Sequence, residues 1–247
     1  VSSVPADLAS LTMSLMDVDP KQRPGATEIL EVLGVDAESD PVALELRHQP
    51  LVGRQDEFAA LRAAYDRVRL NGQSVTVHLQ AESGMGKSKL ISEFLATPLS
   101  SSAPYILRGR CFERESVPYK GLDGVIDSLS SQLRHLSDLE VGAILPRDVT
   151  SLSLLFPVLT QIPAVSNQRK RAATGLDPQE MRQRGVAALR ELFARLGDRH
   201  PLIVIIDDFQ WADPDSARLL NELMSEPDGP MLMLIVAFRP ETDTRAA

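Results

Sequence analysis

Eight residues at positions 81–88 have the composition and order of a phosphate-binding loop. They read Ala-Glu-Ser-Gly-Met-Gly-Lys-Ser, with alanine in place of the usual first glycine, at a position that mainly closes the turn. Gly84 and Gly86 let the backbone turn so that several N–H groups point inward at phosphate oxygens. Lys87 brings a positive charge to the β- and γ-phosphates, and Ser88 offers a hydroxyl to Mg²⁺. The segment therefore predicts binding of ATP, or a similar nucleoside triphosphate, with magnesium.

Two adjacent carboxylates, Asp207 and Asp208, end the apolar run LIVIIDD at 202–208. Such a run is typical of a strand in a parallel sheet covered on both faces, and open α/β sheets bind ligands at the carboxyl ends of their strands. We expect Asp207 to hold magnesium opposite Ser88, and Asp208 to orient or polarise the attacking water as a general base. The alternative interpretation is an Asp-Asp pair that only forms a turn or caps a helix.

Arg239 directly follows a second apolar run at 231–238. A cation at this place can meet the γ-phosphate and respond to its presence. A structural salt bridge explains the same residue, and the sequence leaves both roles open.

Strands and helices alternate along the chain, which predicts an α/β fold with a parallel sheet flanked by helices. The polar stretch at 163–180 is expected to be a loop. The predicted strands are 75–80, 105–112, 202–208 and 231–238, and the predicted helices are 56–71, 89–95, 121–136, 181–196 and 216–224.

Composition narrows the class of protein. A chain of 247 residues that is 43% hydrophobic can bury one core of ordinary size with a small appendage. The net charge of −8 argues against a nucleic-acid partner, because proteins bind nucleic acid through basic surfaces. Cys111 is the single cysteine, so no intrachain disulfide forms, and a reducing cytoplasm is favoured. No apolar run approaches the roughly 20 residues that span a bilayer, so no membrane partner is expected.

Four segments together resemble the AAA-type ATPase module of STAND signalling proteins, also called the origin-recognition-like or AAA-16 type. They are LVGR at 51–54, the loop at 81–88, DDFQWADPDS at 207–216 and AFRPE at 237–241. The resemblance implies ATP and Mg²⁺ as cofactors, with Ser88 and Asp207 on the metal, Asp208 as catalytic acidic residue and Arg239 as sensor. The resemblance places Val52, Gly53 and Arg54 near the adenine. The other residues that it assigns to the nucleotide are Gly84, Met85, Gly86, Lys87, Ser88 and Lys89.

The same family adds a fifth strand and a helical lid after the sensor, so we expect this P-loop domain to be truncated before both. The segment CFERESVPYKGL at 111–122 is similar to the second-strand region of the family, where Pro118-Tyr119 opens a helical insert. The residues of this segment suggest no chemical role.

A second resemblance lies upstream, at LTMSLMDVDPKQRPGATEILEVL, residues 11–33. It is similar to the last helices of a eukaryotic-type Ser/Thr protein kinase, in which an arginine at the position of Arg23 anchors the C-terminal lobe by an ion pair. A generic helical turn is the alternative. We therefore expect a kinase tail at 1–34, a linker at 35–49 and a C-terminally incomplete AAA/STAND ATPase domain at 50–247. No kinase active-site motif is present, so this fragment is not expected to phosphorylate protein.

These resemblances imply an ATP-binding regulatory module, a nucleotide-dependent switch with ATP hydrolysis, in a multidomain bacterial Ser/Thr kinase-type signalling protein. Its partners would be the kinase upstream and a helical-repeat or sensor region downstream. Two alternatives stay open: an oligomeric ATPase motor or DNA-handling ATPase, and a passive scaffold that binds nucleotide weakly or not at all. A motor needs an arginine from a neighbouring subunit, and a DNA-handling ATPase needs a basic track that the acidic balance disfavours.

Overall fold

The computed structural model describes residues 5–17, 19, 22–34, 53–99, 103–113, 118–169, 177–225 and 229–240. The chain divides into two compact units, Val1–Val52 and Gly53–Ala247. The first contains helices α1 (Ala6–Leu15) and α2 (Ala26–Val32), which contact each other. Between them Arg23 donates a hydrogen bond from Nε to the carbonyl oxygen of Asp17 at 2.9 Å. The predicted linker at 35–49 lies outside the described residues.

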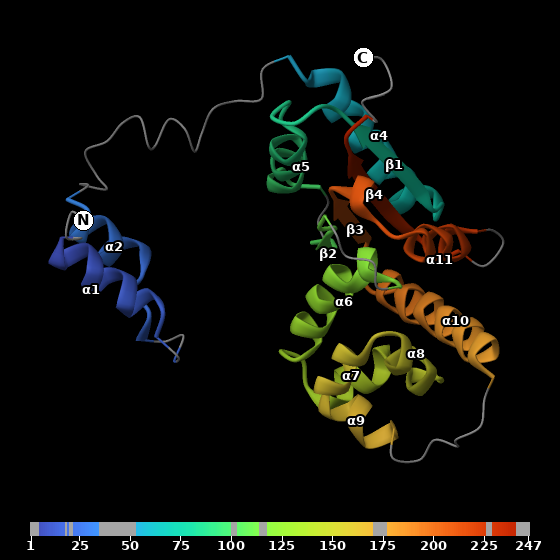
Figure 1. The fold of residues 1–247 in the computed structure, drawn as a ribbon. Helices are drawn as coiled ribbons and strands as arrows, with labels where there is room; N and C mark the ends of the chain where they lie inside the picture. The colour runs from blue at the N-terminus through green and yellow to red at the C-terminus, as the bar shows by residue number, and fades with distance from the viewer. Residues whose placement is uncertain are drawn as a thin grey trace, which may run out of the picture. The chain divides into compact units, whose positions relative to one another are not determined.

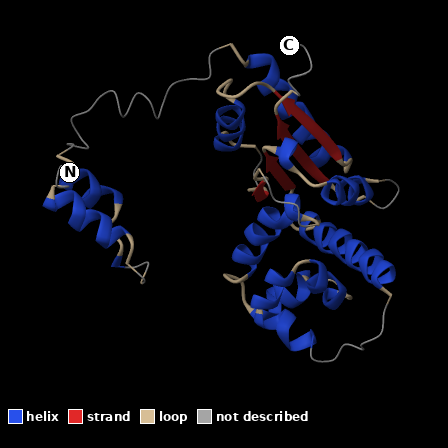
Figure 2. Cartoon of the chain, in the orientation of Figure 1, coloured by secondary structure: helices blue, strands red, loops and turns tan. Residues whose placement is uncertain are grey.

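In the described part of the second unit, four parallel strands form one sheet in the order β1-β4-β3-β2 (Figures 1 and 2). Parallel neighbours need long crossover connections, and here helices supply them, which confirms the predicted α/β class. All the predicted strands are present, with β2 two residues shorter than expected and β3 and β4 each one residue shorter. Their bounds are β1 Val75–Gln80, β2 Tyr105–Arg110, β3 Leu202–Asp207 and β4 Leu232–Phe238.

Helix α4 (Gln55–Asn71) packs on β1 and β4, and α5 (Lys87–Ala96) packs against α4. Apolar residues recur on each at helical spacing, so each helix has one buried side. Tyr65 of α4 and Phe94 of α5 are fully buried and meet edge to face, with ring centroids 6.3 Å apart. Gly72, at φ +64°, ends α4 in the left-handed conformation, as the Asn71-Gly72 pair predicts.

Helices α6 (Lys120–Leu133), α10 (Pro178–Gly197) and α11 (Pro214–Met224) share a continuous hydrophobic core with the other face of the sheet. Three short helices extend this core away from the strands and gather beside α6 and α10 (Figure 1). We call α6 to α10 the helical layer. The short helices are α7 (Asp138–Ile144), α8 (Val149–Leu155) and α9 (Pro163–Arg169), with a 3₁₀ turn, η2 (Pro157–Gln161), before α9.

The prediction of a loop at 163–180 is wrong at both of its described ends. Residues 163–169 form α9, because Val165 is fully buried in the core and this packing outweighs the polar character of the segment. Residues 178–180 already belong to α10, which Pro178 begins at the first helical position. Residues 170–176 lie outside the described part. Among the described helices, none combines the length and the apolar character needed to cross a membrane.

Candidate nucleotide-binding site

The loop at 81–86 leaves β1 at the carboxyl edge of the sheet and leads directly into α5. Gly84 has φ +78° and Gly86 has φ +80°, a conformation that residues with a Cβ rarely adopt. A Cβ at either position would meet no heavy atom within 4 Å, so the requirement for glycine is conformational rather than steric. The turn thus brings backbone N–H groups and the positive end of the α5 dipole to the same point, which suits a phosphate.

Lys87 folds over this loop. Its Nζ donates hydrogen bonds to the carbonyl oxygens of Ala81 at 2.5 Å and Glu82 at 3.1 Å. The ammonium group is therefore held where the loop would receive the β- and γ-phosphates, and phosphate oxygens can replace the two carbonyl acceptors.

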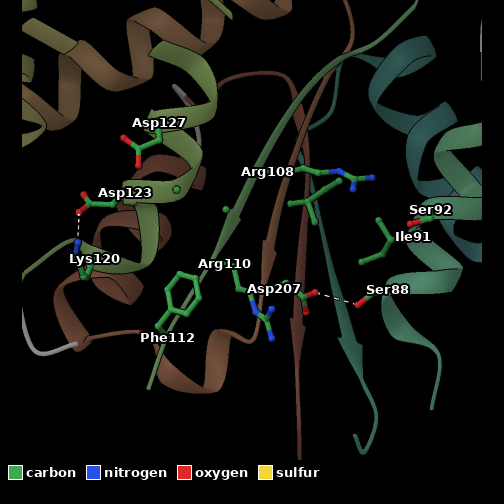
Figure 3. A pocket seen from close by; sticks show the side chains of 13 residues that line it. Ser88, Ile91, Ser92, Arg108, Arg110, Phe112, Lys120, Asp123, Asp127 and Asp207 are labelled. Carbon is green, nitrogen blue, oxygen red and sulfur yellow. Dashed lines mark hydrogen bonds and ion pairs between the residues drawn. The ribbon is translucent and has the colours of Figure 1, made fainter. Parts of the chain in front are cut away.

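Ser88 and Asp207 come together across the site. The hydroxyl of Ser88 donates to Oδ2 of Asp207 at 3.1 Å (Figure 3), and Oδ1 of Asp207 accepts from the backbone N–H of Asp208 at 2.9 Å. Mg²⁺ takes hard oxygen ligands and is held by one or two protein groups together with phosphates and water. A hydroxyl and an oriented carboxylate at this separation fit such an ion.

Asp208 lies behind this pair, in contact with several donors. Its backbone is left-handed, at φ 53° and ψ 39°, and only 8% of the residue is exposed. Arg110 at the end of β2 donates to Oδ2 through Nε at 2.8 Å and a terminal nitrogen at 2.7 Å. Gln210 donates to Oδ1 at 3.1 Å, and a terminal nitrogen of Arg239 lies 3.7 Å from the same oxygen.

These contacts set the charge of Asp208. Burial by itself would raise its pKa, but hydrogen bonds from Gln210 and Arg110 and the positive charges of Arg110 and Arg239 outweigh burial and lower the pKa. The carboxyl group is therefore ionised at neutral pH, and its oxygens are already engaged by donors.

Arg239 makes the ion pair that was one of its two predicted roles. Its backbone N–H also donates to Oε1 of Gln210 at 3.1 Å, which fixes the start of the segment after β4. Its side chain is 44% exposed at the edge where the phosphates would bind, and its role as a sensor stays a prediction.

The residues expected near the adenine are placed in part. Arg54 reaches the loop by donating to the carbonyl oxygen of Met85 at 3.2 Å, and it pairs with Glu57 at 2.6 Å. Gly53 precedes it with φ +73°, and Val52 lies outside the described residues. Lys89 lies in the first turn of α5, where its side chain pairs with Glu93 at 3.6 Å.

Arg110 and Gln210 were missed by the sequence reasoning. Arg110 is paired in register with Asp207, so a charged residue near the end of the predicted strand 105–112 was the available signal. A cavity of about 450 Å³ lies beside it, between α5, β2 and α6 (Figure 3). The guanidinium lies 5.9 Å from the ring centroid of Phe112, which also lines this cavity.

A glycine-containing loop between a first strand and a helix, opposite carboxylates at the end of a parallel strand, defines an α/β P-loop nucleotide-binding protein. A family model described as "AAA ATPase domain" matches residues 50–236, which is more than half of the chain. The chain therefore belongs to the AAA ATPase domain family.

Two relatives extend the comparison. An uncharacterized protein of Rhizobium meliloti (strain 1021) is 25% identical over 199 residues, which cover 77% of this chain and 19% of that protein. The hybrid signal transduction histidine kinase G of Dictyostelium discoideum is 28% identical over 182 residues, which cover 70% of this chain and 5% of that protein. The chain thus spans less than a fifth of the length of either relative.

Proposed function

We propose that this chain is the ATP-binding regulatory module of a multidomain signalling protein, in which the bound nucleotide sets the arrangement of neighbouring domains and hydrolysis resets it. The observation that carries the proposal is the meeting of the Ser88 hydroxyl and the Asp207 carboxylate, 3.1 Å apart, beside the loop that Lys87 covers. These groups lie 119 positions apart in the sequence, and their association builds a place for a phosphate and its metal.

Each group has a separate task. The loop N–H groups and Lys87 bind the phosphates, and Ser88 and Asp207 hold the magnesium, which neutralises charge developing on the phosphates when it is bound. Asp208 accepts a hydrogen bond from the attacking water and then its proton. Arg239 reaches the γ-phosphate and senses its presence.

We expect slow hydrolysis, which favours a switch over a motor. Arg110 and Gln210 engage both oxygens of Asp208, and a carboxylate with a lowered pKa is a weak base. Turnover therefore waits until one oxygen is released to water. Slow hydrolysis suits a switch, because the nucleotide-bound state then persists long enough to act on neighbouring domains.

The signalling context is supported by the N-terminal unit and by the relatives. Met13 and Met16 are 72% and 73% exposed on the small α1–α2 unit, as expected for the last helices of a larger domain that covers them. We assign this unit to the tail of a Ser/Thr protein kinase and the second unit to the STAND class. A relative that carries a signal-transduction name and is far longer than this chain agrees with a multidomain parent.

Calorimetry with Mg-ATP tests the phosphate site. Lys87→Ala is expected to weaken binding at least about 100-fold, because hydrogen bonds to charged groups contribute about 1.5–3 kcal/mol each and about 1.4 kcal/mol corresponds to tenfold. Arg69→Ala, which removes a surface cation of α4 paired with Asp66, is the charge-matched control. An unchanged dissociation constant for Lys87→Ala would contradict the assignment of the loop.

Phosphate release tests hydrolysis and separates a switch from a DNA-handling ATPase. Asp208→Asn is expected to keep nucleotide affinity and to lose about 100-fold or more in turnover, the usual contribution of a general base. The unmodified chain should turn ATP over slowly with or without double-stranded DNA. Strong stimulation of turnover by DNA would favour a motor or DNA-handling ATPase instead.

A further inference from the structure

The carboxylate of Asp213 joins two parts of the ATPase unit that are about ninety positions apart in sequence. It caps α11 by accepting from the backbone N–H of Ser216 at 2.8 Å and from its hydroxyl at 2.5 Å. It also accepts from the backbone N–H groups of Tyr119 at 3.2 Å and Gly121 at 3.4 Å, at the start of α6. Each oxygen thus receives two donors, and only 9% of the residue is exposed.

The two parts are in direct contact around this carboxylate. The N–H of Gly121 also donates to the hydroxyl of Ser216 at 3.0 Å. A Cβ on Gly121 would lie 3.0 Å from Cβ and Oγ of Ser216 and 3.3 Å from Cβ of Ala212, so no larger residue fits without movement. The first turn of α6 therefore cannot shift while the start of α11 stays in place.

Backbone strain occurs at both residues that Asp213 links, Tyr119 before α6 and Asp208 after β3. Among the described residues, Tyr119 (φ 67°) and Asp208 (φ 53°) are the two non-glycine residues with positive φ. Such conformations persist only where the surroundings hold them, and they gather at functional sites. Tyr119 is held by Asp213 through its backbone, and Asp208 begins the short segment 208–213 that ends at Asp213.

The side chain of Tyr119 extends the connection into the helical layer. Its hydroxyl accepts from Nε of Arg182 on α10 at 3.0 Å, and Arg182 pairs with Glu222 of α11 at 2.9 Å. Its ring lies 6.3 Å, centroid to centroid, from Phe156 after α8. Tyr119 thus contacts Arg182 within α10, Phe156 just after α8 and Asp213 just before α11.

We infer that Asp213 is a positioning residue for hydrolysis, which holds segment 208–213 and the first turn of the helical layer as one unit. A displacement of the layer therefore moves Asp208, and a change at Asp208 moves the layer. The residue acts through Asp208 and touches no phosphate itself. The inference rests on the proposed ATPase function of the site and gives a role to Tyr119 and Gly121, which lie in the described end of the 111–122 segment.

Asp213→Asn in the whole chain tests this role, because the amide nitrogen that replaces one oxygen cannot accept the hydrogen bond that this oxygen receives from the N–H of Tyr119 or of Gly121. Asp148→Asn is the matched control: Asp148 caps α8 through the backbone N–H of Ser151 at 3.1 Å and its hydroxyl at 2.8 Å, the same local geometry in a different helix. Both variants should lose thermal stability, and Asp213→Asn should lose more, because Asp213 also accepts from the N–H groups of Tyr119 and Gly121. Asp213→Asn alone should lower kcat about tenfold or more while the Kd for Mg-ATP stays within about twofold.

A double variant separates positioning from a general structural effect. If Asp213 acts through Asp208, the Asp208→Asn, Asp213→Asn double variant should be no slower than Asp208→Asn alone. Losses that multiply in the double variant would overturn the inference. So would an equal loss of nucleotide affinity and turnover in Asp213→Asn, or an equal loss of turnover in Asp148→Asn.

A measurement that needs no turnover keeps failure of the ATPase proposal distinct from failure of this inference. A non-hydrolysable Mg-ATP analogue should change amide hydrogen exchange at 119–125 and the fluorescence of Trp211, the single tryptophan, which lies within segment 208–213. In Asp213→Asn the exchange response should be confined to the phosphate loop. A chain that binds the analogue with no response in α6 would contradict the inference, even if it hydrolyses ATP.

Ser216→Ala covers the case in which Asp213→Asn does not fold. It removes the hydroxyl that accepts from Gly121 and keeps the carboxylate on Tyr119, and Ser151→Ala is its matched control in α8. The same fall in kcat, smaller in size, is expected for Ser216→Ala only. Equal kcat values in the two serine variants and the unmodified chain would overturn the inference.

Discussion

At the scale of single residues, the Asp208 carboxylate is already bound by the groups around it. A base that takes a proton from water needs one oxygen directed at that water, and here Arg110 and Gln210 each engage one oxygen. The side chain of Arg110 is 61% exposed, so it can leave Asp208 without disturbing the core. In the proposed mechanism, Arg110 therefore restrains hydrolysis until it releases Asp208.

Removing that restraint gives the first prediction at this scale. Arg110→Ala is expected to raise basal ATP turnover by about threefold to tenfold, since a barrier lowered by about 1 kcal/mol gives about fivefold. Arg108→Ala, two positions earlier on the same face of β2 and beside the same cavity, is the control. Phosphate release under saturating ATP measures both. A large fall in turnover for Arg110→Ala would mean that Arg110 assists the reaction.

The acidic residues also predict how stability depends on pH. Burial opposes ionisation of Asp213, but hydrogen bonds from the Ser216 hydroxyl and from the N–H groups of Ser216, Tyr119 and Gly121 lower its pKa, as the donors around Asp208 lower that of Asp208. Because the folded-state pKa values lie below the ordinary 3.8, this stabilisation is full above that value and is lost as pH falls through the folded-state values.

Urea unfolding at pH values from about 6 down to about 3 measures this dependence. The free energy of unfolding should fall in the acidic part of the range, and it should fall less steeply for Asp213→Asn, which has lost one of the two groups. Asp66→Asn, on the exposed side of α4, controls for the loss of a surface carboxylate. Identical slopes for Asp213→Asn and the unmodified chain would show that Asp213 contributes no such linkage.

At the scale of elements, β2 and α6 approach each other through two glycines. A Cβ on Gly109 would lie 2.8 Å from the backbone nitrogen and from Cγ2 of Val125, and a Cβ on Gly124 would lie 2.9 Å from Cα of Gly109. This close contact brings the end of β2, which carries Arg110, against the first helix of the layer. Helix α6 and the Arg110–Asp208 pair are therefore coupled by packing as well as by the Asp213 carboxylate.

Gly109→Ala is expected to destabilise the fold by about 1–3 kcal/mol, because the added methyl group has no space. Gly142→Ala is the matched control: a Cβ there meets no atom within 4 Å inside α7, so it should stabilise by about 0.5–1 kcal/mol. Chemical denaturation of the two variants checks both signs. Equal stability of the two would mean that the β2–α6 contact adapts to an added methyl group.

The elements also show how far the sequence could be read. The strands followed from apolar runs between turn residues, and the long helices from their 3.6-residue periodicity. The helices α7, α8 and α9, of seven residues each, are too short for a clear period. The capping box of Ser137 and Glu140 was a usable signal for α7, whereas nothing local indicated that Val165 would be buried.

The site was readable to a similar extent. Loop and strand patterns placed Lys87, Ser88, Asp207 and Asp208 as candidates, since each belongs to a short motif with its own chemistry. Arg110 belongs to no such motif, because its partner is 98 positions away in the sequence and only strand order brings them together. The donors to Asp213 depend on tertiary contact in the same way.

At the scale of the whole molecule, the division into two compact units predicts that the second unit binds nucleotide without help from the first. All described site residues belong to the second unit, Gly53–Ala247. Deleting residues 1–34 should therefore leave the Kd for Mg-ATP within about twofold of that of the whole chain, as expected for independently folded units. Calorimetry on both proteins measures it. A large loss of affinity would mean that the first unit takes part in the nucleotide site.

The position of Lys87 has a consequence for any measured affinity. Its ammonium group is bonded to two carbonyl oxygens of the loop that it serves, so the free protein contains an internal competitor for the phosphate. The apparent affinity equals the intrinsic affinity multiplied by the fraction of molecules whose lysine is released. Changes elsewhere that loosen the loop can therefore tighten ATP binding without adding a single contact to the nucleotide.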